Sequence, residues 1–389
     1  MDFELSIEQS QLVKSVRPFL KKEIAPVIAP YQKSGEIFPK DLVVNVFKKL
    51  IPFGYVSGVV PEDGGGGGLG FSTYGLLLEE LAKISASLAL AEIGQSLVTR
   101  YTLYKQGSDY LKSKYLPGMI EGDIMGAAAL TEPDVGSGAR DITTSAILKG
   151  EEYVINGTKC WSTGGEIADV IFVVAVRNPE KGKPKDYCTF LVDTRQSKIS
   201  SSVYHKLGTR GVGSAEIAFE DCRIPQNHII GEPGKGLDAT LESIGLGRLA
   251  NATIALGIAE SALEKSIEYA NQRKQFGKLI GKFQLIQEMI ADMATEIECA
   301  RLLCCKSWDA LEKGKGSSTL FSMAKYYSTE MAVRVTSKAI EIHGAYGLSD
   351  EYPLERYFRD ARCLTFPDGT SEIQKLIIGR ELIGMQSFV

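Results

Sequence analysis

The sequence predicts an α+β fold in which a helical segment, a β-rich segment and a second helical segment follow one another. Apolar residues recur at helical spacing up to about residue 122. From 123 to 235 the pattern changes to short apolar runs typical of strands, with Gly and Pro at most junctions, and helical spacing returns from 236. A chain of 389 residues is long enough for about two to three domains, and these boundaries predict three: 1–122, 123–235 and 236–389.

The first segment begins with a capping box, Ser6 with Gln9, ahead of an amphipathic helix that Pro26 either closes or separates from the next. A second amphipathic run ends before five consecutive glycines, 64–68, which exclude a helix interior. These glycines form either a flexible linker or an ordered turn, and the flanking helical runs favour the turn. Helical patterning resumes at 73–81 and 88–104.

The β-rich segment contains strand-like runs at 152–155, 170–176, 187–192 and 215–219, and Asn156-Gly157 predicts a hairpin turn. Polar, Gly-rich turns free backbone N–H groups for a ligand. One such turn carries Trp161 and Thr163, a flat apolar wall beside a hydroxyl, which suits a planar heterocycle. The alternative is that Trp161 is a core residue.

The third segment opens after Gly234 and Gly236 with a long helix rich in small residues, which predicts close packing against neighbouring helices. Its Cys304 and Cys305 fall in an apolar helical run and are expected in the core. The seven cysteines form no C-x-x-C pair and only three histidines could join them, so neither disulfides nor a metal site is expected.

The charge distribution excludes some classes of partner. The net charge is −4 and basic residues are dispersed, so neither nucleic acid nor a membrane surface is favoured. No apolar run approaches the ~20 residues that span a bilayer, and the opening M-D-F-E-L lacks the order of a signal peptide. We expect a cytoplasmic protein.

Two motifs connect the pattern to a known family. The residues T-E-P-D-V-G-S at 131–137, followed by K-C-W-S-T at 159–163, resemble the flavin-binding segment of the acyl-CoA dehydrogenase family. The likeness continues through H-K-L-G-T-R-G at 205–211, N-Q-R-K-Q-F-G at 271–277 and P-D-G-T at 367–370, over nearly the whole chain. It implies that family's fold: an N-terminal helical domain, a middle β-barrel-like domain and a C-terminal four-helix-bundle domain.

The resemblance also implies an activity. Members of the family use FAD to remove hydrogen from the α and β carbons of an acyl-CoA thioester, and they pass the electrons to an electron-transfer flavoprotein. The chain is therefore expected to be an oxidoreductase of this kind that assembles as a homotetramer.

The base is the main departure from the family pattern. Relatives usually carry a glutamate in Y-E-G-T, and here the matching residues are Pro367, Asp368, Gly369 and Thr370. The resemblance thus assigns the α-proton to Asp368 and the β-hydride to flavin N5. Some relatives place the base on the long helix instead, where this chain has Gly247. The alternative is that Asp368 only caps the turn at Gly369.

Further site residues follow from the resemblance alone. FAD contacts carry over to Ala128, Leu130, Thr131, Ser137, Trp161, Thr163, Glu341, Ala345, Thr370 and Glu372. The contact of Glu341 is in doubt, because many relatives carry glutamine there. FAD contacts from a neighbouring subunit carry over to Arg273, Gln275 and Phe276, and substrate contacts to Ser137, Arg248, Gly369 and Glu92. Glu92 is either a pocket carboxylate or an ordinary exposed one.

The substrate and the integrity of the site stay open at this point. Pro367 and the shorter base together would enlarge the space around the α-carbon, which favours a branched or alicyclic acyl group. The alternatives are a dehydrogenase or oxidase acting on a carrier-protein-bound thioester, or a flavin-binding homologue with weakened catalysis.

Overall fold

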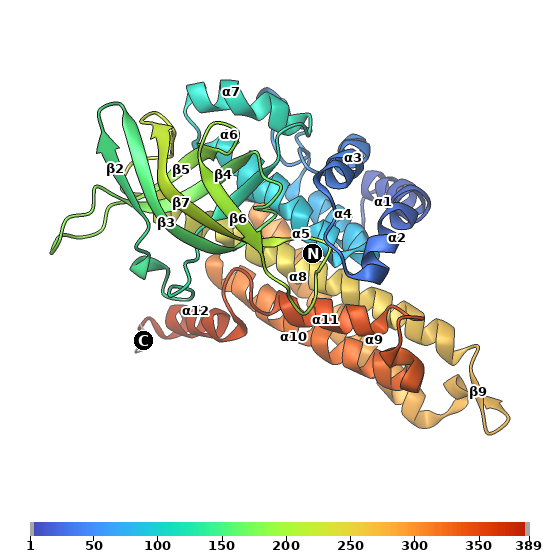
Figure 1. The fold of residues 1–389 in the computed structure, drawn as a ribbon. Coiled ribbons are helices and arrows are strands. Elements are labelled where there is room, and N and C mark those ends of the chain that lie inside the picture. Colours follow the sequence, from blue (N-terminus) through green and yellow to red (C-terminus); the bar gives the residue numbers. More distant parts are fainter. Residues whose placement is uncertain (1–3, 386–389) are drawn as a thin grey trace.

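The computed structural model describes residues 4–385, and Figure 1 shows the β-rich segment and the N-terminal helices above the long C-terminal helices. The N-terminal helices are α1 (Ile7–Phe19), α2 (Ala25–Ser34), α3 (Lys40–Leu50), α4 (Phe71–Ile84), α5 (Ala86–Ile93), α6 (Thr102–Gln106) and α7 (Asp109–Ile120). π-helical turns at Leu20–Ile24 and Gly94–Tyr101 join α1 to α2 and α5 to α6. The predicted capping box of Ser6 and Gln9 is confirmed, and Pro26 lies in the first turn of α2 and does not close α1.

The five glycines form an ordered turn, as expected, and not a linker. Gly67 and Gly68 donate backbone hydrogen bonds to Ser57 and Val60. A Cβ added to Gly66 would lie 2.1 Å from the Val60 carbonyl oxygen, so no larger residue fits there. The run therefore lets the chain fold back closely on itself between α3 and α4.

The middle segment is one mixed sheet of eight strands. Its strands are β1 (Gly126–Ala129), β2 (Ser145–Lys149), β3 (Glu152–Thr163), β4 (Val170–Arg177), β5 (Tyr187–Asp193), β6 (Ile199–Val203), β7 (Ser214–Pro225) and β8 (Ile229–Ile230). They lie in the order β6-β7-β3-β2-β4-β5-β8, and β1 pairs in parallel with β4. Most pairs are antiparallel, and a cluster of apolar side chains fills one face of the sheet.

The predicted hairpin turn at Asn156-Gly157 is wrong. The turn between β2 and β3 lies at Gly150, and β3 continues through Asn156 with a β-bulge beside it. The Asn156 side chain exchanges two hydrogen bonds with Asp221 of β7, and a Cβ on Gly157 would meet Thr144 at 2.5 Å. Asn156 thus lies at a β-bulge, and Gly157 allows Thr144 to approach the backbone closely. Both roles use the same residue pair as a hairpin turn, so the local sequence does not distinguish them.

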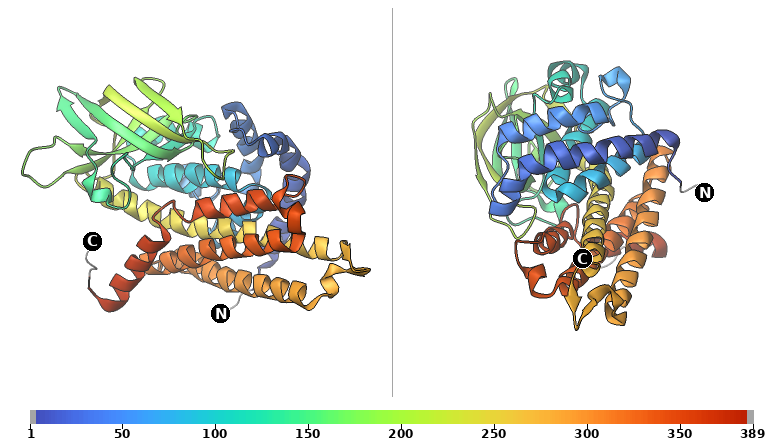
Figure 2. Two further views of the ribbon diagram at one scale, coloured as in Figure 1. Left: turned by 60° about the horizontal axis from the view of Figure 1, so that its bottom comes forward. Right: turned by 90° about the vertical axis from the view of Figure 1, so that its right-hand side faces the viewer.

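The C-terminal segment is helical except for a small hairpin. Its elements are α8 (Gly236–Ala270), β9 (Lys274–Gln275), β10 (Lys278–Leu279), α9 (Gln284–Glu312), α10 (Ser318–His343), α11 (Leu354–Leu364) and α12 (Ser371–Ile383). Figure 2 shows α12 and the β9–β10 hairpin at opposite ends of the long helices. Cys304 is buried as expected, but Cys305 is exposed, because neighbouring residues on a helix point about 100° apart.

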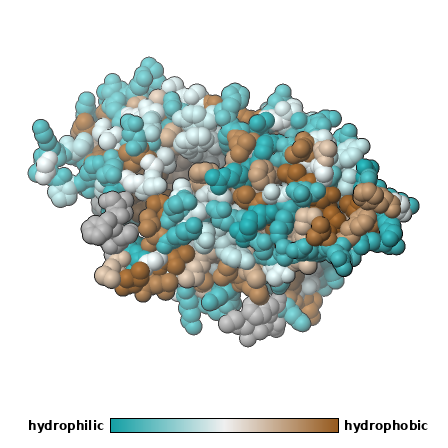
Figure 3. All heavy atoms as spheres, turned by 90° about the horizontal axis from the view of Figure 1, so that it is seen from below, coloured by the Kyte–Doolittle hydropathy of each residue, from teal (hydrophilic) through white to brown (hydrophobic). Residues whose placement is uncertain are grey.

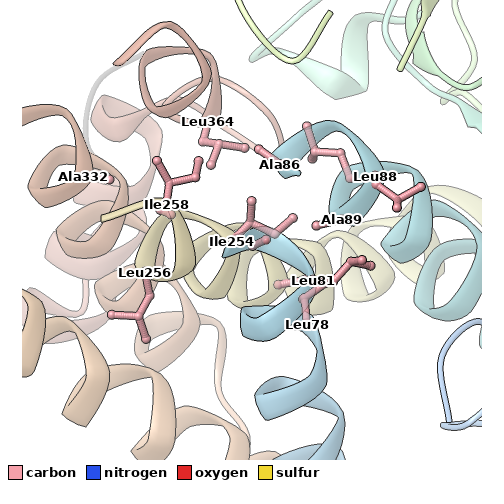
Figure 4. Close-up of a cluster of buried hydrophobic side chains, with 14 of the residues drawn as sticks. Leu78, Leu81, Ala86, Leu88, Ala89, Ile254, Leu256, Ile258, Ala332 and Leu364 are labelled. Carbon is pink, nitrogen blue, oxygen red and sulfur yellow. The ribbon is translucent and has the colours of Figure 1, made fainter. Parts of the chain in front are cut away.

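The two helical segments share one apolar core. Leu78 and Leu81 of α4 and Leu88 of α5 pack with Ile254 and Ile258 of α8 (Figure 4). The close approach rests on small residues, since a Cβ on Gly257 would lie 2.6 Å from the carbonyl oxygen of Glu79. Within residues 4–385, no helix has the length and apolar character that crossing a membrane requires.

Candidate active site

The turn between α11 and α12 carries Asp368 and is held by side chains of α10 and α12. The Lys325 ammonium of α10 donates to the carbonyl oxygens of Thr365 (2.8 Å) and Gly369 (2.7 Å). Gln374 donates to the carbonyls of Asp368 (3.0 Å) and Gly369 (2.8 Å). Asp368 itself has a φ of 58°, a left-handed conformation that costs energy outside Gly, so the surrounding contacts over-determine this turn.

The carboxylate of Asp368 faces α8. Its Oδ2 accepts a hydrogen bond from Asn251 Nδ2 at 2.7 Å, and Arg248 Nε donates to the Asp368 backbone oxygen at 3.1 Å. The N-cap of α12 is Thr370, whose hydroxyl accepts from the N–H of Ile373. The carboxylate of Asp368 is therefore engaged across the interior and does not cap the following helix.

The surroundings of Asp368 favour a proton-accepting carboxyl group. Burial raises the pKa of Asp368, while Lys325, Arg248 and the Asn251 hydrogen bond oppose the rise. Burial also lowers the pKa of Lys325 to about 8. A carboxylate whose pKa is shifted toward the working pH can take a proton and hold it.

Trp161 lies in a bulge near the C-terminal end of β3 and not in the core. Its side chain is 55% exposed and its φ is 59°. The indole stacks on the ring of Tyr204, with centroids 4.6 Å apart, and the Tyr204 hydroxyl donates to Glu216 at 2.6 Å. The core alternative is excluded, and a flat aromatic surface is presented outward.

The two predicted flavin motifs lie side by side. The N–H of Cys160 donates to the carbonyl of Thr131 at 2.9 Å, which joins β3 to the segment after β1. Ala128, Leu130 and Thr131 are half-buried along this segment, Thr163 ends β3, and Ser137 is exposed. The hydroxyl of Ser162 is buried and has no hydrogen-bond partner among residues 4–385. An exposed indole, an orphaned hydroxyl and open backbone groups fit a planar heterocyclic cofactor.

One loop connects the Trp161 region with the Asp368 turn. Tyr204 follows β6, and the same loop then docks on α11, where Gly208 N–H donates to Cys363 Sγ and Thr209 N–H to Asp360. Since α11 leads directly into the Asp368 turn, the sheet and the turn are fixed relative to each other.

A second group of predicted FAD residues gathers elsewhere. Phe276 is 91% exposed on the β9–β10 hairpin beside exposed Arg273 and Gln275, at the end of the bundle away from the sheet (Figures 1 and 2). Glu341 and Ala345 are exposed near the same end. On α10, Glu341 lies about 24 Å along the axis from Lys325, at ~1.5 Å per residue. The single chain therefore does not bring these five residues to Asp368.

Glu92 is fully buried, which excludes the exposed alternative. Its carboxylate accepts hydrogen bonds from the N–H of Val56 (2.9 Å) and the hydroxyl of Tyr74 (2.6 Å). Both oxygens are thus engaged within the helical domain. Its neighbour Gln95 exchanges two hydrogen bonds with Gly126 and so fastens the helical domain to β1.

Sequence reasoning missed several residues that build the site: Asn251, Lys325, Glu132 and Tyr204. Asn251 had a detectable signal, since it lies one helical turn after Gly247 and next to the assigned Arg248. Lys325 lies within α10 and is 0% exposed, a placement that a charged residue adopts only with partners.

The family models cover nearly the whole chain. Residues 6–123, 127–222 and 234–383 match the N-terminal, middle and C-terminal domains of acyl-CoA dehydrogenase. The probable acyl-CoA dehydrogenase YngJ of Bacillus subtilis is 38% identical over 384 residues, which are 98% of this chain and 100% of that protein. The cyclohex-1-ene-1-carbonyl-CoA dehydrogenase of Syntrophus aciditrophicus is 37% identical, over 98% of this chain and 91% of that protein. Subunit CarC of the caffeyl-CoA reductase-Etf complex of Acetobacterium woodii is 34% identical, over 97% and 98%.

Solved structures agree in fold. Butyryl-CoA dehydrogenase from Megasphaera elsdenii superposes with a TM-score of 0.92 and 33% identity, covering 98% of this chain and 100% of that chain. A glutaryl-CoA dehydrogenase from Mycobacterium smegmatis, in complex with FADH2, superposes with a TM-score of 0.91 and 27% identity, covering 99% and 97%. The chain belongs to the acyl-CoA dehydrogenases, a family of FAD-dependent oxidoreductases.

Proposed function

We propose that this protein catalyses the α,β-dehydrogenation of an acyl-CoA thioester with FAD as cofactor and Asp368 as base. The observation that carries the proposal is the position of the Asp368 carboxylate. It is held by Asn251, beside two cations and on a fixed turn, in surroundings that raise its pKa. Such a group has both the fixed position and the basicity that proton abstraction needs.

Each group at the turn has a defined part in this reaction. Oδ2 of Asp368 is engaged by Asn251, which leaves Oδ1 for the α-proton. The backbone N–H of Asp368 is the donor that would stabilise the developing charge on the thioester oxygen. Arg248 and Lys325 hold the turn while the carboxyl group changes its charge. FAD, when bound beside Trp161, would accept the β-hydrogen as a hydride.

The cofactor site is completed by a second copy of the chain. Exposed Arg273, Gln275 and Phe276 would reach the adenosine diphosphate half of FAD in the neighbouring subunit, because a guanidinium pairs well with phosphate. Exposed apolar side chains support self-association: in α12 and just after it, Leu382, Ile383 and Met385 are each more than 60% exposed. Figure 3 views the molecule from below the orientation of Figure 1. Hydrophobic side chains gather at both ends of the face that it shows. The assembly we propose is a homotetramer.

An electron-transfer flavoprotein is the proposed acceptor, and the acyl group is proposed to be branched or alicyclic. The first proposal is supported by the relative named as part of a reductase-Etf complex. The second is supported by the relative named for a cyclohexene carbonyl thioester and by exposed Pro367 beside the shorter base. If butyryl-, hexanoyl- and octanoyl-CoA all outperform every branched and cyclic thioester in kcat/KM, the second proposal is wrong.

Anaerobic mixing of the FAD-loaded protein with a panel of acyl-CoA thioesters tests the reaction. We expect bleaching of the flavin absorbance by at least one of butyryl-, isobutyryl- and cyclohexane-1-carbonyl-CoA. Asp368→Asn should retain FAD and bind the same thioester, yet reduce flavin ~100-fold more slowly or worse, the scale of losing a general base. Near-normal reduction in that variant would remove Asp368 from its role. Absence of bleaching by every thioester would favour the catalytically weakened flavin-binding homologue.

A further inference from the structure

The carboxylate of Asp368 occupies space that only a glycine on α8 leaves open. A Cβ built on Gly247 would lie 2.4 Å from Asp368 Oδ2 and 2.9 Å from its Cγ, well inside any normal contact. Gly247 lies within α8, where a glycine is otherwise destabilising relative to alanine. The absence of a side chain at 247 is therefore a condition for the observed position of the carboxylate.

Asn251 lies one turn further along α8 and is 1% exposed. Its Nδ2 donates both to Asp368 Oδ2 (2.7 Å) and to the carbonyl oxygen of Gly247 (2.9 Å). Because both partners are acceptors, the amide can only present its NH2 group to them, which fixes the orientation of the side chain. Its Oδ1 is buried and finds no hydrogen-bond partner in the described part of the chain. Leaving a buried acceptor unpaired is unfavourable, so any favourable contribution of this amide comes from its NH2 group.

We propose that Asn251 is the positioning residue of the base. It holds the Asp368 carboxylate against Gly247, so that α8 determines where the free oxygen of the carboxylate lies. The proposal rests on the proposed function, in which Asp368 takes the α-proton. An aspartate has about 1.5 Å less reach than a glutamate, and a misplacement of ~1 Å can cost ~100-fold in rate. Anchoring one oxygen on α8 gives the short acid a defined position for the other oxygen.

The same contact influences when Asp368 is ionised. The Asn251 hydrogen bond favours the carboxylate form, as do the charges of Lys325 on α10 and Arg248 on α8, against the effect of burial on the pKa. Further charged groups act on these two cations from α10 and α12: Glu330, Glu372 and Arg380. Removing the Asn251 amide leaves every one of these charges in place, so its effect on Asp368 can be measured separately.

Asn251→Leu is the decisive variant, because leucine has a similar volume and lacks the donor. In the FAD-loaded protein without substrate, the Asp368 carboxyl is titrated by infrared difference spectroscopy, its band identified by its loss in Asp368→Asn. We expect the pKa of Asp368 to rise by about one to two units in Asn251→Leu, the effect of losing one hydrogen bond to a charged group. Flavin reduction by the best thioester of the panel should fall ~10–100-fold near pH 7. The pH profile of that rate should shift to higher pH by as much as the pKa of Asp368 rises.

Two further variants make the result specific. Gly247→Ala must displace the carboxylate and should reproduce the slower reduction, and it decides alone if Asn251→Leu does not fold. Ser266→Ala is the matched control on α8, since its buried hydroxyl donates to Ala262 only one turn back. It should leave the rate and the pH profile unchanged.

The outcomes separate this proposal from the proposed function. Unchanged titration and rate in Asn251→Leu and Gly247→Ala, together with loss of reduction in Asp368→Asn, would overturn the positioning role and keep the base. Retained reduction in Asp368→Asn would overturn the base itself. A lower unfolding temperature in Asn251→Leu, with an unshifted titration of Asp368, would also reject the positioning role.

Discussion

Lys159 and Glu132 form an ion pair inside the β domain, with Nζ 2.8 Å from Oε1 and both side chains at most 5% exposed. Lys159 also donates to the carbonyl oxygen of Leu130 at 2.9 Å. The pair thus ties the segment that carries Thr131 to the strand that carries Trp161. Although burial opposes ionisation, hydrogen bonds led by that from Lys159 lower the pKa of Glu132 to about 2.

Breaking this pair should loosen the flavin region. Lys159→Met leaves the Glu132 charge buried, so we expect a loss of about 3–5 kcal/mol in the free energy of unfolding and a lower FAD content after gel filtration. Urea denaturation and the ratio of flavin to protein absorbance measure the two effects. Lys183→Met is the control, because its pair with Glu180 is exposed and should contribute little. Equal stability of the two variants would contradict the assigned role of the buried pair.

Arg273→Ala should lower FAD retention without unfolding the chain. Arg273 is exposed on the β9–β10 hairpin, and its guanidinium lies 5.8 Å from the centre of the Tyr346 ring, so its loss removes little packing. Fluorescence of FAD released on dilution gives the dissociation constant, which we expect to rise ~10-fold or more through the loss of a phosphate partner. Lys278→Ala, an exposed cation on the same hairpin, should retain the cofactor. Full FAD retention by Arg273→Ala at low protein concentration would count against a site shared between subunits.

The stability of the protein should depend on the ionisation of Asp368. Burial raises its pKa in the folded state, so ionisation destabilises that state, and the stability from this group falls as pH rises from about 4 through the folded pKa. Asp368→Asn cannot ionise and should therefore unfold at a higher temperature than the wild type at pH 8. The gap should narrow as pH falls toward about 4, as followed by calorimetry. A difference in unfolding temperature that does not depend on pH would show that ionisation of Asp368 does not cause it. The control is Asp134→Asn, at an exposed position, which should unfold at the wild-type temperature.

The turn of five glycines can be tested by one methyl group. Gly66→Ala would place a Cβ 2.1 Å from the Val60 carbonyl oxygen, and we expect about 1–3 kcal/mol of destabilisation in urea. Gly379→Ala in α12 is the control, since no atom of the described residues lies within 4 Å of its added Cβ and alanine favours the helix. A flexible linker would tolerate both changes equally.

Much of the fold could be predicted from the sequence because its patterns are local. Helical periodicity and the capping box at Ser6 specify where α1 begins, and strand runs such as 170–176 coincide with β4. Asn156-Gly157 was misassigned because its bulge depends on Asp221, 65 residues away. Partners that distant leave no trace in a short window.

The site was predictable only where a motif marked it. Trp161 and Asp368 carry motifs that mark them. Asn251 instead binds Asp368 across 117 residues, and Lys325 holds the same turn from a separate helix through the carbonyl of Gly369. Their roles come from tertiary contacts that composition and spacing do not encode. Glu92 shows the converse: its position in an apolar run does not determine its burial, which depends on the hydrogen bonds from Val56 and Tyr74.

Asp368→Glu tests whether the pocket is built around the shorter acid. The present carboxylate already fills the space above Gly247 and is anchored by Asn251, so one more methylene must push the glutamate away from α8 or into the substrate. We expect flavin reduction to fall ~10-fold or more, with FAD content unchanged, because the reacting oxygen is displaced by about 1 Å or more. Stopped-flow reduction by the best thioester of the panel measures this directly. If Asp368→Glu matches or exceeds the wild type, the aspartate is an incidental replacement of the family's glutamate, and α8 does not set the position of the base.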